Sequence, residues 1–220
     1  MASLVKRLPA PYDFGWTFRT ADDCEVVETH LGDGRYEIRL DHAPLKGVTT
    51  EMLTWWFQVF DGTATYRGQS LPAYHLWHPR DHVAVKLTRN EAGRVAPKER
   101  VHIQEVFGRD KRFSIDARSG IHRWDGRGVG LHLDVAGHRL LELDHVFKDS
   151  PNGAIYQSCM RAGGGVGPLR RIINTAVLPR RFGAAQRAAW IRHNFEEVGC
   201  FEHFLPELFE TKAITPSSAS

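Results

Sequence analysis

The sequence predicts an α+β fold in which a curved antiparallel sheet surrounds one long C-terminal helix, a helix-grip arrangement. Short segments with strand-like alternation occupy most of residues 36–161. Glycine, proline, asparagine and aspartate separate them, as in RNEAG (89–93) and DSPNGA (149–154). A long helical segment then closes the chain, at about residues 184–205. An antiparallel sheet that curls around such a helix leaves a cavity between the two.

The predicted elements begin with a strand and a helix. Residues 36–41 (YEIRLD) alternate between apolar and polar side chains, which is typical of a strand. Residues 49–62 predict a helix with Thr50 as a candidate N-cap. Apolar residues at three-and-four spacing mark the buried face of this helix: Leu53, Trp56, Phe57 and Phe60.

The remaining strands follow in the middle of the chain. They are predicted at residues 73–78, 82–88, 100–108, 112–117, 128–137, 139–149 and 154–161. A glycine-rich stretch (162–167) and a basic, partly helical segment come next, and residues 161–183 together are a candidate lid over the cavity. The final helix would be roughly 33 Å long at ~1.5 Å per residue, and Pro206 is expected to end it.

Length and composition place the chain in an ordinary class. Its 220 residues predict a single domain over residues 1–210, with residues 211–220 as a disordered polar tail. The net charge of +3 is mild and its basic residues are scattered, which argues against nucleic acid as a partner. No apolar run reaches the roughly 20 residues of a membrane span, and no signal peptide is visible. The three cysteines have no metal-binding spacing, so reduced thiols in a cytoplasmic protein are expected.

Each of three predicted strands places one ionisable residue on a face that is otherwise apolar or aromatic. His78 shares its face with Tyr74 and Leu76. The other two are Glu105, among Val101, Ile103 and Phe107, and His145, among Leu141, Leu143 and Phe147. A buried carboxylate without a partner costs several kcal/mol. These three side chains are therefore candidates for a shared interior site.

The final helix adds an imidazole and a carboxylate to this set. His193 and Glu197 lie four residues apart and project from one side of the helix. Their neighbours on that side are Ala189, Trp190, Cys200, Phe201 and Phe204. Two histidines and two glutamates facing one interior would suit Zn²⁺, and Fe²⁺ or Mn²⁺ would accept the same ligands.

A different orientation of the helix leads to the opposite conclusion. Ile191, Phe195 and Val198 form a second apolar set on its other side. If that set faced the core, His193 and Glu197 would face water and no metal site would form. The metal hypothesis requires both sides to be covered, either by N-terminal residues or by a second subunit.

Other motifs carry less information. The stretch AGGGVG (162–167) lacks the lysine and hydroxyl residue of a phosphate-binding loop. The arginine pairs at 170–171 and 180–181 are typical of solvated surface, although they could attract an anion. Ser158 and Cys159 lie in no recognisable nucleophile motif, which argues against a serine or cysteine hydrolase.

Several blocks resemble the 2,4-diacetylphloroglucinol hydrolase family, which includes phloretin hydrolases. They are HAPLKGVTTEMLTWWF (42–57), YHLWHPRDH (74–82), VHIQEVFG (101–108), LDHVF (143–147) and RHNFEE (192–197). The resemblance spans roughly residues 36–205 and implies a Bet v 1-like helix-grip fold with a zinc ion in its cavity. It also implies cleavage of the carbon–carbon bond between an acyl group and a phenolic ring.

The resemblance assigns roles to particular residues. It implies zinc ligation by His78, Glu105, His193 and Glu197. It also implies a polar residue three positions after the first ligand, here Asp81, and a later strand histidine near the substrate, here His145. Tyr74 and Tyr156 are the nearest candidates for the tyrosines that hold the phenol in the family. The chain lacks much of the family's N-terminal extension, which leaves the substrate open.

Three functions follow as alternatives. The first is a zinc-dependent hydrolase of acylated phenols, acting on a small aromatic ketone, with His145 or a tyrosine supplying the proton to the ring carbon. The second is a non-catalytic carrier of an apolar ligand. The third is an aromatic polyketide cyclase of the same fold. The apolar residues on both sides of the last helix, together with the resemblance, also predict a homodimer.

Overall fold

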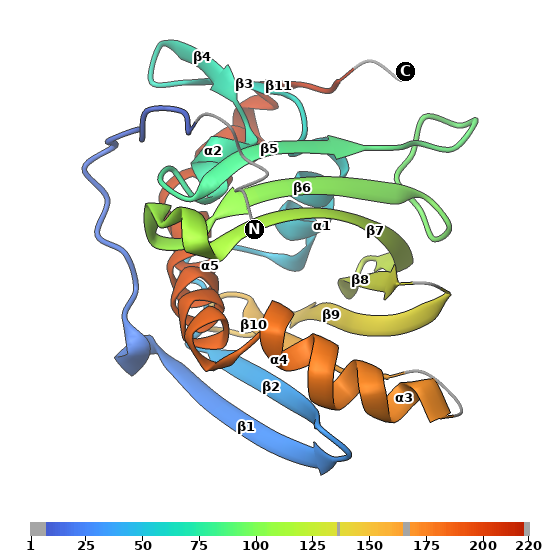
Figure 1. Ribbon diagram of the computed structural model, residues 1–220. Coiled ribbons are helices and arrows are strands. Elements are labelled where there is room, and N and C mark those ends of the chain that lie inside the picture. The colour runs from blue at the N-terminus through green and yellow to red at the C-terminus, as the bar shows by residue number, and fades with distance from the viewer. Residues whose placement is uncertain (1–7, 136, 165–167, 218–220) are drawn as a thin grey trace.

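A curved sheet of eight antiparallel strands dominates the structure, a computed structural model that describes residues 8–135, 137–164 and 168–217 (Figure 1). The strand order across the sheet is β1-β2-β10-β9-β8-β7-β6-β5. The strands are β1 (Cys24–Gly32), β2 (Arg35–His42), β5 (His82–Leu87), β6 (Arg100–Val106), β7 (Ser114–Asp125), β8 (Gly128–Val135), β9 (His138–Lys148) and β10 (Ile155–Ala162). A smaller sheet joins β3 (Thr63–Tyr66) to β4 (Gln69–Pro72) and to β11 (Ile214–Thr215).

The long helix α5 (Ala184–Thr211) lies against this sheet together with α1 (Thr50–Val59) (Figure 1). Shorter helical turns connect the strands: η1 (Ala21–Asp23), α2 (Tyr74–Trp77), η2 (Phe107–Arg109) and η3 (Lys111–Phe113). A curved antiparallel sheet packed around a C-terminal helix is the predicted α+β helix-grip class, which is thereby confirmed. Among the described residues, no helix has both the length and the apolar character needed to cross a membrane.

Aromatic side chains fill the space between α5, α1 and the sheet. The rings of Trp56 and Phe204 have centroids 4.9 Å apart, and those of Trp77 and Phe201 are 5.4 Å apart. Trp56, Phe201 and Phe204 are fully buried. Burial of each such ring stabilises the fold by about 1.5–3 kcal/mol, so this cluster fixes α5 against the rest of the molecule.

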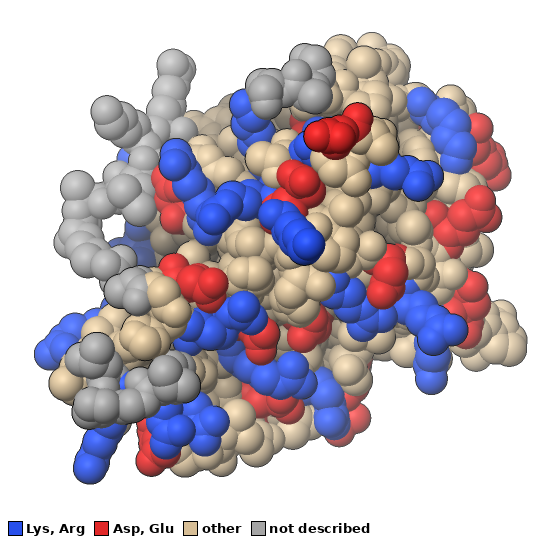
Figure 2. All heavy atoms as spheres, turned by 90° about the vertical axis from the view of Figure 1, so that its right-hand side faces the viewer, with Lys and Arg blue, Asp and Glu red and all other residues tan. Residues whose placement is uncertain are grey.

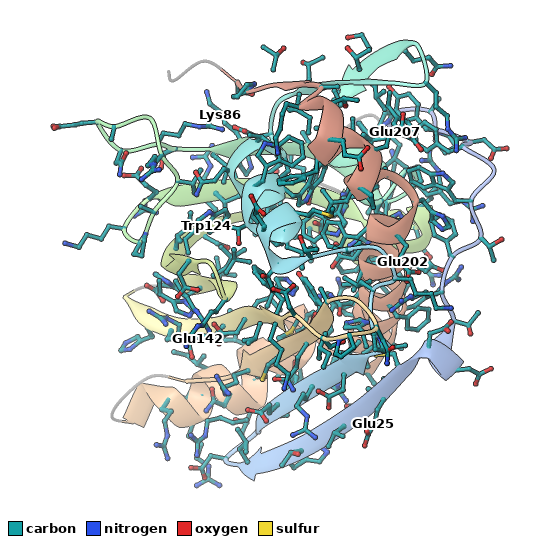
Figure 3. The ribbon with its side chains drawn as sticks, turned by 180° about the vertical axis from the view of Figure 1, so that it is seen from behind. Glu25, Lys86, Trp124, Glu142, Glu202 and Glu207 are labelled. Atoms are coloured by element: carbon teal, nitrogen blue, oxygen red, sulfur yellow. The ribbon has the colours of Figure 1, made fainter. Side chains whose placement is uncertain are left out.

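The N-terminal segment covers the other side of α5 (Figure 1). Phe18 stacks on the ring of His78, and Trp16 stacks on Phe204. The Arg19 guanidinium donates to Glu202, which projects from α5 in Figure 3, at 2.9 Å. A Cβ on Gly199 would lie 2.5 Å from the Arg19 side chain, so a glycine is needed where Arg19 crosses the helix. Residues of the same chain therefore bury both sides of α5.

Two local predictions are wrong. Residues 74–77 form helix α2 and not a strand: the Leu76 amide donates to the Ala73 carbonyl in a local turn, no described strand pairs with the segment, and all four side chains are buried. The N-cap of α1 is Thr49 and not Thr50, since the Thr49 hydroxyl accepts a hydrogen bond from the Met52 amide. The Thr50 amide and hydroxyl donate instead to the carboxylate of Asp149.

The C-terminal part of the chain also differs from expectation. Helix α5 continues through Pro206 to Thr211, because the last turns bury Leu208 and the packing they gain outweighs the lost hydrogen bond. Ile214 and Thr215 then form β11, which pairs with β3, so residues 211–217 belong to the fold. Residues 218–220 of the predicted tail lie outside the described part of the chain.

The segment between β10 and α5 is helical. It consists of α3 (Pro168–Ile172), the π-helical turn η4 (Ile173–Val177) and α4 (Leu178–Arg181). Buried Leu178 and Phe182 pack in a second core cluster with Trp190 of α5 and Met160 of β10. Residues 165–167 of the glycine-rich stretch lie outside the described residues. The lid motion expected for this region stays a prediction.

Strand β1 was not predicted from the sequence. Most of its residues are exposed and it has no alternating apolar face, so only its pairing with β2 makes it a strand. Lysine, arginine, aspartate and glutamate side chains are interspersed over the face in Figure 2. This mixture fits the mild net charge and forms no continuous basic stripe on that face.

Candidate metal centre and active site

Four side chains from three elements converge inside the sheet: His82, Glu105, His193 and Glu197. The His82 Nε2 atom lies 3.5 Å from a Glu105 oxygen and 3.4 Å from Glu197 Oε2. The His193 Nε2 atom lies 3.5 Å from the same Glu197 oxygen and 3.9 Å from Glu105 Oε2. His82, His193 and Glu197 are buried, and the Glu105 side chain is 13% exposed.

Local structure brings these four together. His82 opens β5 and is paired in register with Glu105 of β6, so their side chains emerge side by side. His193 and Glu197 lie one turn apart on α5. Aromatic packing holds α5 over this end of the sheet, and Phe107, which follows β6, contacts the His193 ring at 4.6 Å between centroids.

The hydrogen bonds around the two imidazoles fix which nitrogen carries a proton. His82 Nδ1 lies 2.8 Å from the Tyr74 carbonyl oxygen, which only accepts, so Nδ1 is the donor. His193 Nδ1 lies 3.1 Å from the Asp81 carboxylate and donates in the same way. Each ring therefore turns an Nε2 lone pair inward when it is neutral.

This donor set fits a divalent cation. Neither Nε2 atom has a hydrogen-bond partner among the described residues, although both are buried. With both imidazoles neutral, two nitrogen lone pairs and two carboxylates are all electron donors, and such a group is costly to bury without a positive charge between them. In the metal-free protein a proton supplies that charge, because burial, which lowers the pKa of His193, is outweighed by Glu197, Asp81 and Glu105, which raise it well above its usual value, and a divalent cation would replace that proton. Two histidines and two carboxylates are a ligand set that Zn²⁺ accepts.

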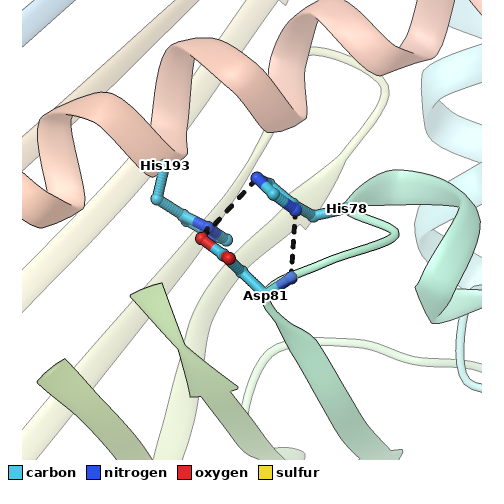
Figure 4. A group of neighbouring side chains, drawn as sticks. All are labelled: His78, Asp81 and His193. Carbon is cyan, nitrogen blue, oxygen red and sulfur yellow. Dashed lines mark hydrogen bonds and ion pairs between the residues drawn. The ribbon is translucent and has the colours of Figure 1, made fainter. Parts of the chain in front are cut away.

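A second polar group lies directly behind the first: His78 and Asp81 lie next to His193 (Figure 4), and Glu196 contacts His78. His78 Nδ1 accepts the Asp81 amide at 3.1 Å, and its Nε2 donates to Glu196 at 3.2 Å. Both of its nitrogens are thus engaged. Its ring stacks on His193 at 4.7 Å between centroids.

The structure therefore brings together three of the four expected ligands, Glu105, His193 and Glu197, and places His78 in the neighbouring group. Because residues 74–77 form a helix, His78 falls at its C-terminal end, and the following turn places His82 beside Glu105. The available signal was a second histidine four residues on, in WHPRDH. The alternation of β5 did not indicate that His82 faces the interior, since Ala84 and Lys86 on the same face are not core residues.

Burial and neighbouring charges shift the titration of this group in opposite directions. Burial raises the pKa of Glu105 to about 7 and lowers the pKa of His82 to about 3. Burial alone would also raise the pKa of Glu197, but contacts with His193 and His82 hold it below its usual range. The cluster thus holds carboxylates of different basicity in contact with imidazoles.

A cavity of about 400 Å³ opens beside the cluster, and Glu105, His193 and Glu197 line it. Its other walls are largely apolar or aromatic and include Phe57, Trp77, Trp124, Leu143, Val177 and Leu178. Val177 and Leu178 come from the helical segment that covers the cavity between β10 and α5. The space suits an aromatic or aliphatic group held next to a polar centre.

The other predicted site residues occupy different positions. His145 and Tyr74 both line the cavity. The Tyr74 hydroxyl donates to Glu105, and the Tyr74 ring stacks on the His82 ring with 3.7 Å between their centroids. Asp81 lies behind His193 and also accepts the Gly108 amide at 2.9 Å. Tyr156 is fully buried next to His145, but it is not among the cavity-lining residues and its hydroxyl has no partner among those described. The roles predicted for these four stay predictions.

Fold and site together define a Bet v 1-like helix-grip protein with a candidate metal centre at the wall of an apolar cavity. Residues 29–113 match the family model described as DAPG hydrolase PhiG domain. The matched segment contains α1, α2, β5 and β6, and with them His82 and Glu105. The match confirms, over this segment, the family resemblance predicted from the sequence.

Similar solved structures include two with START-related titles. A START superfamily protein from Mycobacterium smegmatis is 12% identical, with a TM-score of 0.45, over 79% of this chain and 98% of that chain. A STAR-related lipid transfer protein from Xanthomonas axonopodis is 16% identical, with a TM-score of 0.40, over 82% of this chain and 98% of that chain. No curated protein sequence matches this chain.

Proposed function

We propose that this protein is a zinc-dependent hydrolase that cleaves the carbon–carbon bond between an acyl group and a phloroglucinol-like ring. One observation carries the proposal: two buried imidazoles, whose inward Nε2 atoms have no hydrogen-bond partner among the described residues, face two carboxylates at the wall of an apolar cavity. The family match over residues 29–113 supports hydrolysis of an acylphloroglucinol. The substrate would then be a small aromatic ketone.

His82, Glu105, His193 and Glu197 would hold the metal, with His82 in the place that the sequence assigned to His78. A bound divalent cation supplies Lewis-acid chemistry toward a carbonyl oxygen or a water molecule. The two nitrogens and carboxylate oxygens suit Zn²⁺, and the same set accepts Fe²⁺ or Mn²⁺. Asp81 and the Tyr74 carbonyl would orient the two imidazoles from behind.

Residues that line the cavity would bind the phenolic ring and supply the proton. Trp77, Trp124 and Phe57 provide aromatic surface for the phenolic ring. Hydrolysis breaks the bond between the acyl carbon and the ring carbon; water supplies a hydroxyl group to the acyl carbon and a proton replaces the acyl group on the ring. His145 lines the cavity and is the proposed donor of that proton. The ring carbon of a phenol can accept this proton, because protonation at that carbon gives the keto tautomer of the phenol.

The test combines metal analysis with product analysis. We expect stoichiometric zinc in the purified protein by mass spectrometry, and carboxylic acid release from a panel of acylphloroglucinols of increasing acyl length. Glu105→Gln and His193→Ala should lose both metal and turnover. The control His122→Ala removes an exposed histidine paired with Asp144 and should retain both. Full activity of metal-free Glu105→Gln protein would refute the proposal.

A carrier of an apolar ligand is the second candidate, and the largely apolar wall of the cavity favours it. A carrier has no need of stoichiometric metal. Binding of acylphenols without any release of acid, by a protein that purifies without zinc, would favour this candidate. Cyclisation of an aromatic polyketide without acid release would instead indicate a cyclase. A homodimer and a cytoplasmic location stay predictions.

A further inference from the structure

A chain of buried polar side chains links Glu197 of the candidate metal centre to His145 on the cavity wall. Asn194 Nδ2 donates to Glu197 Oε1 at 2.8 Å. Asn194 Oδ1 lies 3.2 Å from His42 Nε2, and that nitrogen lies 3.5 Å from Ser158 Oγ. Ser158 Oγ lies 3.0 Å from His145 Nδ1. Asn194 and Ser158 are fully buried, and the two histidines are at most 5% exposed.

The four linking residues come from separate parts of the sequence. His42 ends β2, Ser158 lies on β10, His145 on β9 and Asn194 on α5. Ser158 and His145 are register partners, so their side chains project from the same face of the sheet. Burying polar groups without hydrogen bonds costs free energy. The contacts along this chain are therefore expected to pair each donor with an acceptor in one consistent order.

The direction of the first two hydrogen bonds follows from donor chemistry. A carboxylate only accepts, so the amide nitrogen of Asn194 must face Glu197 and the amide oxygen must face His42. The reverse orientation would place two oxygens against each other. Because the amide oxygen also only accepts, His42 Nε2 must carry the hydrogen.

The same donor and acceptor rules determine which nitrogen of His145 carries the hydrogen. A His42 Nε2 that donates has no lone pair for the Ser158 hydroxyl, so that hydroxyl directs its hydrogen to the shorter contact, His145 Nδ1. His145 Nδ1 therefore accepts, and the neutral ring carries its hydrogen on Nε2. That nitrogen has no protein partner among the described residues, and His145 lines the cavity.

We infer that Asn194, His42 and Ser158 are positioning residues that set the tautomer of His145, so that its Nε2–H donates into the cavity. This inference rests on the proposed function, because it supplies the proton donor which ring protonation requires. It also couples the two halves of the site, since the same Asn194 that orients a ligand carboxylate starts the chain that orients the donor.

Nuclear magnetic resonance of the zinc-loaded protein with ¹⁵N-labelled histidine tests the inference directly. The ¹⁵N shifts distinguish the protonated from the unprotonated nitrogen of a neutral ring, and the signals that vanish in His145→Gln identify His145. We expect the Nε2–H tautomer in the unaltered protein. A His145 ring that carries its hydrogen on Nδ1 would overturn the inference without any variant.

Removal of the serine hydroxyl tests its role. In Ser158→Ala, His145 Nδ1 loses its donor, so we expect a mixture of tautomers together with a tenfold or greater fall in kcat and little change in KM. The matched control is Tyr66→Phe, which deletes a buried hydroxyl that donates to the His203 carbonyl far from the chain described above. It should change neither tautomer nor kcat. An unchanged tautomer in Ser158→Ala would refute the inference.

These outcomes separate the inference from the proposed function. The tautomer is observed without substrate, so it is read even if acylphloroglucinols are not hydrolysed. An Nε2–H ring that responds to Ser158→Ala, in a protein that cleaves none of them, would retain the positioning chain and reject the substrate class. Acid release by a protein whose His145 carries its hydrogen on Nδ1 would support the proposed hydrolase function and reject the positioning chain.

Discussion

The Asp81 carboxylate contacts Nδ1 of His193 at 3.1 Å, on the side of the ring opposite the Nε2 atom that faces Glu105 and Glu197. Asp81 is itself held by the Gly108 amide at 2.9 Å. A buried carboxylate in this place fixes both the ring orientation and the tautomer of a metal ligand. The polar residue that the family resemblance implied at position 81 thus lies where it can act on the candidate metal centre through His193.

Asp81→Asn should weaken metal binding without removing a ligand. An amide accepts from His193 more weakly than a carboxylate does, so we expect roughly a 10- to 100-fold loss of zinc affinity, measured by competition with a chelator. Asp144→Asn is the matched control, because Asp144 pairs with His122 outside the cavity. Equal losses in both variants would contradict the role of Asp81.

Alanine variants of the two neighbouring histidines distinguish the two possible ligand sets. His82→Ala should abolish stoichiometric zinc, because it removes an inward Nε2 atom with no other partner among the described residues. His78→Ala should retain most of the metal, since both His78 nitrogens bond to protein groups. Metal content of the purified variants is the measurement. Retention of zinc by His82→Ala and its loss from His78→Ala would restore the assignment made from the sequence.

Acid should destabilise the protein in part through His42. Burial lowers the pKa of His42 to about 4, with the nearby Arg19 and His145 acting in the same direction and Asn194 and Glu197 opposing them. The unfolded chain therefore binds this proton first, and stability is lost as pH falls from about 6.5 towards 4. The full contribution is on the order of 3 kcal/mol.

His42→Gln isolates that contribution, because its side-chain amide can still donate to Asn194 without titrating. Urea unfolding at pH 7 and pH 5 should show a smaller loss of unfolding free energy in the variant than in the unaltered protein. The effects of other buried histidines and of metal release are common to both proteins. An identical pH dependence would show that His42 does not titrate as its burial implies.

The size of the cavity should limit the acyl group. Leu143→Phe adds volume to the wall of the cavity and should raise KM for long acyl chains more than for acetyl. Excluding one methylene costs about 0.8 kcal/mol, or roughly fourfold in binding. Leu31→Phe, on the exposed surface of β1, is the control and should change no KM. A uniform effect on all chain lengths would place the acyl group elsewhere in the cavity.

Local periodicity was enough to predict several parts of the site. The alternation of residues 101–107 placed Glu105 on an apolar face, and the 3.6-residue period of the last helix placed His193 beside Glu197. The same patterns identified most of the strands and the helix-grip class. These features depend on neighbours within a few residues, so they are visible in the sequence itself.

The remaining features depend on contacts between distant segments. Residues 74–77 are a buried helical turn although their side chains alternate like those of a strand, and the β5–β6 register made His82 the partner of Glu105. The N-terminal segment covered the outer side of α5, and β11 drew residues 214–215 into the fold. The sequence determined which residues face inward along each element, because that follows from the chain's own period. Only the packing of those elements decided which inward groups meet, since register and distance across the interior are properties of the whole fold.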